Sequence, residues 1–139
     1  AWDSLVLKRK YVAALEGIPE KKQASIKSYL KETKTLMVYS TNDKKNGKLA
    51  ITNYKVIKSN DKYSLLDIEI KTGRKNQIRV HMSDIGNPIL GDKKYGNKKS
   101  FSKRLMLHAY NLEILNPKTK RKMIFSCNVP KQFFKLFEN

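Results

Sequence analysis

Apolar and polar residues alternate along much of this chain, which is the pattern of β-strands with one face in water. The clearest case is the stretch in which Leu66, Ile68 and Ile70 alternate with charged residues. Further strands are predicted where valine, leucine, isoleucine and tyrosine gather between turn residues. These strands are Leu5–Glu16, Leu36–Tyr39, Leu49–Ile57 with Ala50, Thr52, Tyr54 and Val56 on one face, and a hairpin of Leu105–Leu115 with Met123–Val129.

The period of the pattern changes after residue 73. Ile78, Met82 and Ile85 fall at the spacing that places them on one face of a helix. Gly86 and Pro88 then follow in the order typical of a helix end. A chain of many strands and few helices predicts an α+β fold, with a mixed, largely antiparallel sheet and a few flanking helices.

Three segments are less regular. Glu20–Glu32 carries Ile26 and Leu30 at helical spacing, but an extended linker fits it equally well. Gly91–Lys103 is rich in glycine and lysine and predicts a loop, whereas Lys131–Phe137 predicts a terminal helix.

The length of 139 residues indicates a single domain over residues 1–139, with no linker or repeat dividing it. Cys127 is the one cysteine, which excludes an internal disulfide framework and fits a reducing compartment. No apolar run approaches the roughly 18 residues of a membrane span. We therefore expect a cytoplasmic protein.

The charge narrows the class of partner. Thirty lysines and arginines against twelve acidic residues give a net charge of +18. Such an excess repels itself in a compact state and favours a polyanionic partner, of which nucleic acid is the first. A membrane surface is less favoured, because the basic residues are scattered through strands and turns. The alternative is a soluble basic protein whose charge has no specific polyanionic partner.

Common enzyme patterns are absent from the sequence. It has no glycine-rich phosphate loop and no G-x-S-x-G segment. His81, His108 and the distant cysteine lack the spacing of a zinc site. Composition and spacing alone therefore predict a basic α+β protein that binds nucleic acid.

Four segments add a specific resemblance. Gly73–His81 reads G-R-K-N-Q-I-R-V-H and Gly86–Gly96 reads G-N-P-I-L-G-D-K-K-Y-G. Arg104–Ala109 reads R-L-M-L-H-A, and Lys10–Gly17 reads K-Y-V-A-A-L-E-G. Together they resemble, in order, the signatures of RluA-type RNA pseudouridine synthases, the ribosomal large subunit pseudouridine synthase family.

The resemblance implies the pseudouridine synthase fold and the isomerisation of uridine to pseudouridine in structured RNA, ribosomal or transfer RNA. It implies no cofactor and no metal, because a carboxylate nucleophile and a base pocket carry the chemistry. We expect a monomer whose partner is RNA. The alternative is a non-catalytic basic RNA-binding module.

Members of that family carry the catalytic aspartate in an H-R-L-D segment, which this sequence lacks. Asp3 is the one aspartate near the amino end, and its context is different. We therefore expect residues 1–139 to be the carboxy-terminal portion of a synthase catalytic domain, inactive alone but able to bind RNA.

The resemblance also implies roles for individual residues. Arg79 pairs with the catalytic aspartate and keeps it ionised and oriented, as a guanidinium can. Without that acid, we expect water or an anion beside Arg79. Tyr11 stacks on the uracil and its hydroxyl assists proton transfer.

The remaining candidates contact substrate. Leu107 and Ile89 are expected to line the uracil pocket, with core packing as the alternative. Asp92 is expected to cap and pack its loop. For the basic residues among the polar candidates we expect contacts with phosphates, with a solvated face as the alternative. The polar candidates are Arg74, Lys75, Asn76, Gln77, Lys93 and Lys94.

Overall fold

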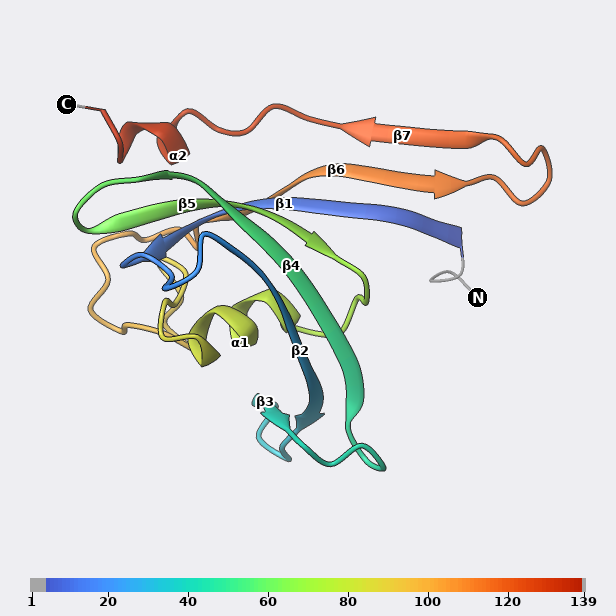
Figure 1. The fold of residues 1–139 in the computed structure, drawn as a ribbon, viewed down its shortest axis with the longest axis horizontal. Helices are drawn as coiled ribbons and strands as arrows, with labels where there is room; N and C mark the ends of the chain where they lie inside the picture. The colour runs from blue at the N-terminus through green and yellow to red at the C-terminus, as the bar shows by residue number, and fades with distance from the viewer. Residues whose placement is uncertain (1–4, 139) are drawn as a thin grey trace.

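The computed structural model describes residues 5–138, and these form one seven-stranded sheet with two short helices (Figure 1). Every strand pair in this part of the chain is antiparallel, so the predicted α+β class is confirmed. The strands lie in the spatial order β3 (Val38–Thr41), β2 (Gln23–Glu32), β4 (Lys48–Ser59), β5 (Tyr63–Ile70), β1 (Val6–Glu16), β6 (Leu107–Leu115) and β7 (Lys122–Ser126).

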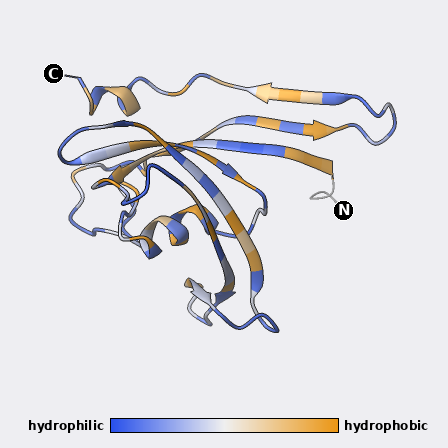
Figure 2. Cartoon of the chain, in the orientation of Figure 1, coloured by the Kyte–Doolittle hydropathy of each residue, from blue (hydrophilic) through white to orange (hydrophobic). Residues whose placement is uncertain are grey.

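The alternating pattern of β4 and β5 explains their place in the sheet. Ala50, Thr52 and Tyr54 are buried on one face of β4, as the pattern predicts, and the residues between them are more exposed. Figure 2 shows hydrophobic and hydrophilic bands along β4, without a strict alternation from one residue to the next. Leu66 and Ile68 of the neighbouring β5 are fully buried and belong to the main core.

The predictions for the segment Glu20–Glu32, a helix or a linker, are both wrong. Most of it forms β2, which pairs with β3 on one side and β4 on the other. Within β2, Ala24, Ile26 and Leu30 are more buried than the residues that alternate with them. The segment is therefore a strand because two neighbours satisfy its backbone, which short-range spacing does not reveal.

Helix α1 (Gln77–Asp84) lies inside the bend of the sheet, beside β3 and β4 (Figure 1). Its apolar stripe is the predicted one: Ile78 and Met82 are buried and Ile85 packs against the same core. The helix ends at Asp84, and Gly86 directly after the capping residue has a φ of +85°, a left-handed conformation that glycine adopts freely.

The carboxy-terminal part adds two features. The predicted terminal helix is a single turn, α2 (Gln132–Lys135), fixed by the fully buried ring of Phe133. The predicted hairpin forms β6 and β7. In the pairing of β1 with β6, Lys10 lies opposite Asn111 and Tyr11 opposite Ala109, so Tyr110 is an extra residue, a β-bulge.

Candidate active site

A cavity of about 180 Å³ lies between the start of α1 and the central strands. Tyr11 of β1, Leu107 of β6 and Arg79 of α1 all line it, although they are far apart in sequence. We call it the β1–α1 cavity. Its lining residues are Tyr11, Ile70, Arg74, Asn76, Gln77, Ile78, Arg79 and Leu107.

The guanidinium of Arg79 is paired with Asp92. Nε donates to one carboxylate oxygen at 3.0 Å and Nη2 to the other at 2.8 Å, a bidentate arrangement. The ring of Tyr95 also lies 5.1 Å from the guanidinium carbon. The carboxylate beside Arg79 therefore comes from the chain itself, because the turn after Gly91 brings Asp92 to it; water or an anion beside Arg79 stays a prediction.

Asp92 is fixed on all sides. Its side chain is 0% exposed, and it also accepts hydrogen bonds from the backbone N–H groups of Lys94 and Tyr95, which confirms its predicted capping of the loop. Burial alone raises the pKa of the carboxyl, but Arg79 and these N–H groups lower it further than burial raises it. The same hydrogen bond raises the pKa of Arg79. The pair is thus ionised and rigid at neutral pH.

Tyr11 lies in β1, beside the β-bulge that Tyr110 forms in β6. It is paired with Ala109 of β6 and Ile68 of β5. It is partly exposed and faces the β1–α1 cavity, whereas the next four residues of β1 are buried. A partly exposed aromatic ring at a cavity offers a flat apolar surface with a polar end. This arrangement is compatible with the stacking role that the sequence predicts for Tyr11.

Gln77 and Asn76 hold the loop before α1. Gln77 is buried and uses both ends of its amide: Oε1 accepts from Thr72 and the backbone of Arg74, and Nε2 donates to Ile51 and Thr52. Its polar groups are therefore occupied by protein.

Asn76 has a φ of +56° and donates to the hydroxyl of Tyr95 at 3.1 Å. That hydroxyl also accepts from the backbone N–H of Val38, which ties the start of α1 to β3. Although both residues line the cavity, their hydrogen bonds indicate that they shape it.

Only one of the two apolar candidates, Leu107 and Ile89, lies at the cavity. Leu107 lines the β1–α1 cavity, but Ile89 does not. Ile89 is 1% exposed, forms a β-bridge with Leu15 and packs in the main core, which was the alternative for it.

The four basic candidates also differ in whether they line the cavity. Arg74 lines the cavity and donates through Nε to the carbonyl of Leu49 at 2.8 Å. Lys75 pairs with Glu32 at 2.6 Å and lies outside this cavity. Lys94 donates to the carbonyl of Leu36, and Lys93 is exposed on the same loop. Only Arg74 among the four therefore faces Tyr11 and Arg79.

No aspartate within residues 5–138 lines the β1–α1 cavity. Asp92 comes near through Arg79, but both of its oxygens are occupied and buried. The one near the amino end, Asp3, lies outside the described residues. The described part of the cavity thus holds a base-sized space and cations but no free carboxylate.

Sequence reasoning missed two contributions to the site. Ile70 and Ile78 line the cavity, although the sequence marks them only as core positions. The pairing of Asp92 with Arg79 was missed as well, since the two lie in different segments of the resemblance.

The described residues contain neither a cluster of metal ligands nor a membrane-spanning helix. Nowhere in residues 5–138 do three or more His, Cys, Asp or Glu side chains gather as metal ligands would. None of the helices in that range has the length and apolar character needed to cross a membrane.

Comparisons with known proteins identify the family of the chain. The family model described as RNA pseudouridylate synthase matches residues 2–84. An uncharacterized RNA pseudouridine synthase of Helicobacter pylori is 38% identical over 133 residues, which are 96% of this chain and 52% of that protein. The ribosomal large subunit pseudouridine synthase C of Rickettsia typhi is 45% identical over 114 residues, covering 79% of this chain and 37% of that protein.

A solved structure supports the same assignment. Human RNA pseudouridylate synthase domain containing 1 superposes with a TM-score of 0.75 at 25% identity, over 87% of this chain and 54% of that one. The chain therefore belongs to the RNA pseudouridylate synthase family, and to its RluA-type branch. It spans about half the length, or less, of the relatives named above.

Proposed function

We propose that this protein takes part in the isomerisation of uridine to pseudouridine in RNA. The observation that carries the proposal is the meeting of Tyr11, Leu107 and Arg79 at one cavity. The uridine must leave its stack to enter, which costs a few kcal/mol that phosphate contacts offset. The net charge of +18 supplies such contacts.

The reaction breaks the N-glycosidic bond, turns the uracil and joins it again through carbon. Tyr11 and Leu107 hold the base, and the Tyr11 hydroxyl assists the proton transfer that completes the product. Arg79 orients the catalytic carboxylate. Since Asp92 occupies Nε and Nη2, the N–H groups of Nη1 are left for that second carboxylate.

We further propose that these 139 residues bind RNA without converting it. The sequence has no H-R-L-D segment, and no described aspartate lines the cavity. Ribosomal RNA incubated with the purified chain should show no new pseudouridine in carbodiimide mapping. New pseudouridine would contradict this and would point to another carboxylate of the chain.

The substrate we propose is ribosomal or transfer RNA, ribosomal RNA first. The support is the name of the Rickettsia typhi relative, a ribosomal large subunit pseudouridine synthase. We expect the protein in the cytoplasm, where both RNAs are found. Mapping pseudouridine in both RNAs from cells with and without the complete gene decides between them.

The proposed reaction is tested through Tyr11 in the product of the complete natural gene. Tyr11→Phe keeps the ring but removes the hydroxyl, so RNA affinity should persist while conversion falls about 100-fold or more. The matched control is Tyr39→Phe, because Tyr39 is exposed on β3 and lies outside the cavity. If the natural product binds RNA yet forms no pseudouridine, the function is that of a non-catalytic RNA-binding module.

A further inference from the structure

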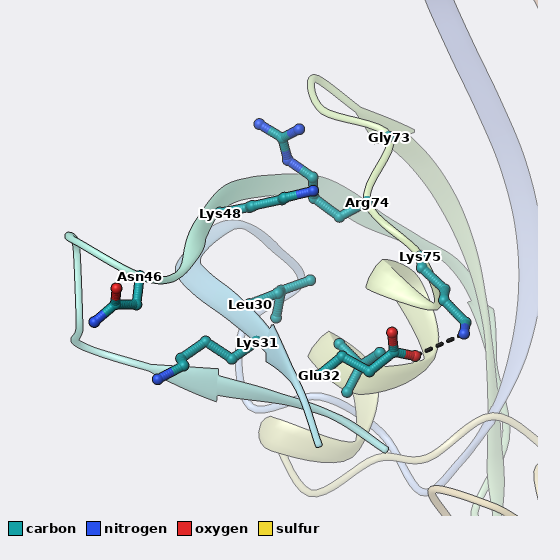
Figure 3. Close-up of a pocket in the computed structure, with 9 residues that line it drawn as sticks. Leu30, Lys31, Glu32, Asn46, Lys48, Gly73, Arg74 and Lys75 are labelled. Atoms are coloured by element: carbon teal, nitrogen blue, oxygen red, sulfur yellow. Dashed lines mark hydrogen bonds and ion pairs between the residues drawn. The ribbon is translucent and has the colours of Figure 1, made fainter. Parts of the chain in front are cut away.

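A second and larger cavity lies on the other side of Arg74. It has a volume of about 470 Å³, within the range of ligand sites, and we call it the β2–β4 cavity. It is formed by β2, the turn that leads into β4, and the loop before α1 (Figure 3). Its lining residues are Leu30, Lys31, Glu32, Val38, Asn46, Lys48, Gly73, Arg74 and Lys75.

The charges of this cavity favour an anion. Four cations and one carboxylate line it. Lys75 is neutralised by Glu32 at 2.6 Å, and Lys31 by Asp43 at 3.4 Å. Figure 3 shows the pair of Lys75 with Glu32 beside Leu30. The ion pairs leave Lys48 and Arg74 as the cations available to a ligand.

Both of these cations have donors to spare. Within residues 5–138, the ammonium of Lys48 has no hydrogen-bond or ion-pair partner, and Lys48 is exposed. Arg74 is anchored by Nε to the carbonyl of Leu49, and its two terminal nitrogens have no partner in the same range. An anchored guanidinium beside an unpaired ammonium is the donor set of a phosphate site.

The floor of the cavity is apolar. Leu30 and Val38 are 5% and 6% exposed and belong to the second core cluster, so they form a fixed surface. Arg74 lines this cavity and the β1–α1 cavity alike. A ligand that bridges the two must therefore carry a negative charge at Arg74 and extend on both sides of it, as a single RNA strand does.

We propose that the β2–β4 cavity binds the nucleotide next to the target uridine, with its phosphodiester on Lys48 and Arg74 and its sugar and base against Leu30 and Val38. The proposal rests on the proposed function, since it needs the uridine in the β1–α1 cavity. It adds a second recognition site, which selects an unpaired strand over a lone nucleoside.

The test measures binding of a uridine trinucleotide to the whole 139-residue chain, at graded salt, by fluorescence anisotropy. Lys48→Gln should weaken binding about tenfold and reduce the slope of log K against log salt by about 0.7. The matched control is Lys55→Gln, because Lys55 is exposed on the same strand but outside the cavity. A trinucleotide with neutral methylphosphonate linkages should bind both variants equally.

A second variant changes affinity in the opposite direction. Glu32→Gln removes the carboxylate that neutralises Lys75, so binding of the charged trinucleotide should tighten. Glu20→Gln, which removes the same charge from an exposed site outside the cavity, should have a smaller effect.

Each other outcome overturns the proposal in a distinct way. Equal effects of Lys48→Gln and Lys55→Gln would indicate diffuse charge attraction, with the proposed function intact. Full competition by inorganic phosphate, with no gain from uridine monophosphate to trinucleotide, would indicate a site for a free anion. No binding of any RNA by the unchanged chain would remove the proposed function itself.

Discussion

Arg79 is held in one orientation by a neighbouring carboxylate, that of Asp92, to which the proposed reaction gives no chemical step. Asp92 fixes the guanidinium through two hydrogen bonds and is itself fixed by the backbone of its own turn. The fixed guanidinium is thus directed before any substrate is present, so no ordering cost falls on the reaction step.

The Arg79→Lys variant of the complete gene product separates orientation from charge. Lysine keeps the charge but cannot bind Asp92 in two places and a second carboxylate at once. Conversion should fall about 100-fold, because small misplacements of a reacting group are that costly. RNA affinity should stay the same, and single-turnover assays at saturating enzyme measure the two effects separately.

Lys93→Ala is the control for that experiment, since Lys93 is exposed and outside the β1–α1 cavity. It should weaken RNA binding slightly and leave the saturated rate intact. An intact saturated rate in Arg79→Lys, with weaker binding, would make Arg79 a phosphate contact.

Asp92→Asn tests the pair through stability. Removing one charge from a buried pair costs about 3 kcal/mol, the lower end of the usual range because Arg79 is 23% exposed. The folded-state pKa of Asp92 is lowered, so its stabilisation is present above its unfolded pKa of about 3.9 and is lost as pH falls through the folded value. The unfolding free energies of the two proteins, measured with urea, should therefore differ most at pH 7, and the difference should narrow as the pH falls below about 3.9. A difference independent of pH would exclude this account.

At the scale of elements, two glycines with the same backbone conformation have different surroundings. Gly91 and Gly86 have φ values of +82° and +85°. A Cβ at Gly91 would lie 2.0 Å from the carbonyl oxygen of Arg104, whereas one at Gly86 would meet nothing within 4 Å. The turn that carries Asp92 thus begins where two backbone segments touch.

Gly91→Ala should therefore destabilise the chain more than Gly86→Ala. Gly86→Ala pays only for the left-handed backbone, about 1–2 kcal/mol. Gly91→Ala adds the movement of a backbone segment, about 1–3 kcal/mol more. Thermal unfolding of the two variants measures the difference, and equal melting temperatures would show that the Arg104 segment yields freely.

The sequence predicts most of the helices and strands, but it does not predict which strands pair with each other. The buried positions of β4 and β5 follow from their period, whereas those of α1 follow only in part, because Val80 and His81 are buried as well as the predicted Ile78 and Met82. β2 was not predicted, because Ile26 and Leu30 fit the spacing of a helix as well as that of a strand, and pairing with β3 and β4 decides between the two.

The candidate site, like the fold, could be predicted from the sequence only in part. The resemblance led to Arg79 and Leu107, which do meet at one cavity. It did not distinguish Leu107 from Ile89, because both are apolar and only the packing decides which side chain faces the cavity. The partner of Arg79 was missed for a related reason: ion pairs between separate segments depend on tertiary geometry.

At the scale of the whole molecule, the net charge of +18 should govern RNA affinity. The logarithm of the binding constant should fall linearly with the logarithm of salt concentration, by about 0.7 for each phosphate contacted on a single strand. Titrations of a labelled single-stranded RNA between low and moderate salt give the number of contacts. Affinity that does not change with salt would refute an electrostatic origin.

The β-bulge at Tyr110 gives β6 one residue more than its pairing with β1 requires. Loss of that residue would leave Ala109 opposite Tyr11 and Asn111 opposite Lys10, in regular register. An extra residue between Leu107 and Ala109 has no such compensation, because a shift by one position turns a strand's side chains to the other face. In an evolving gene, a codon lost at the bulge would thus keep Leu107 at the cavity wall, although the hydrogen bond from Tyr110 to Asp67 would be lost, whereas a codon gained beside Leu107 would turn the wall away.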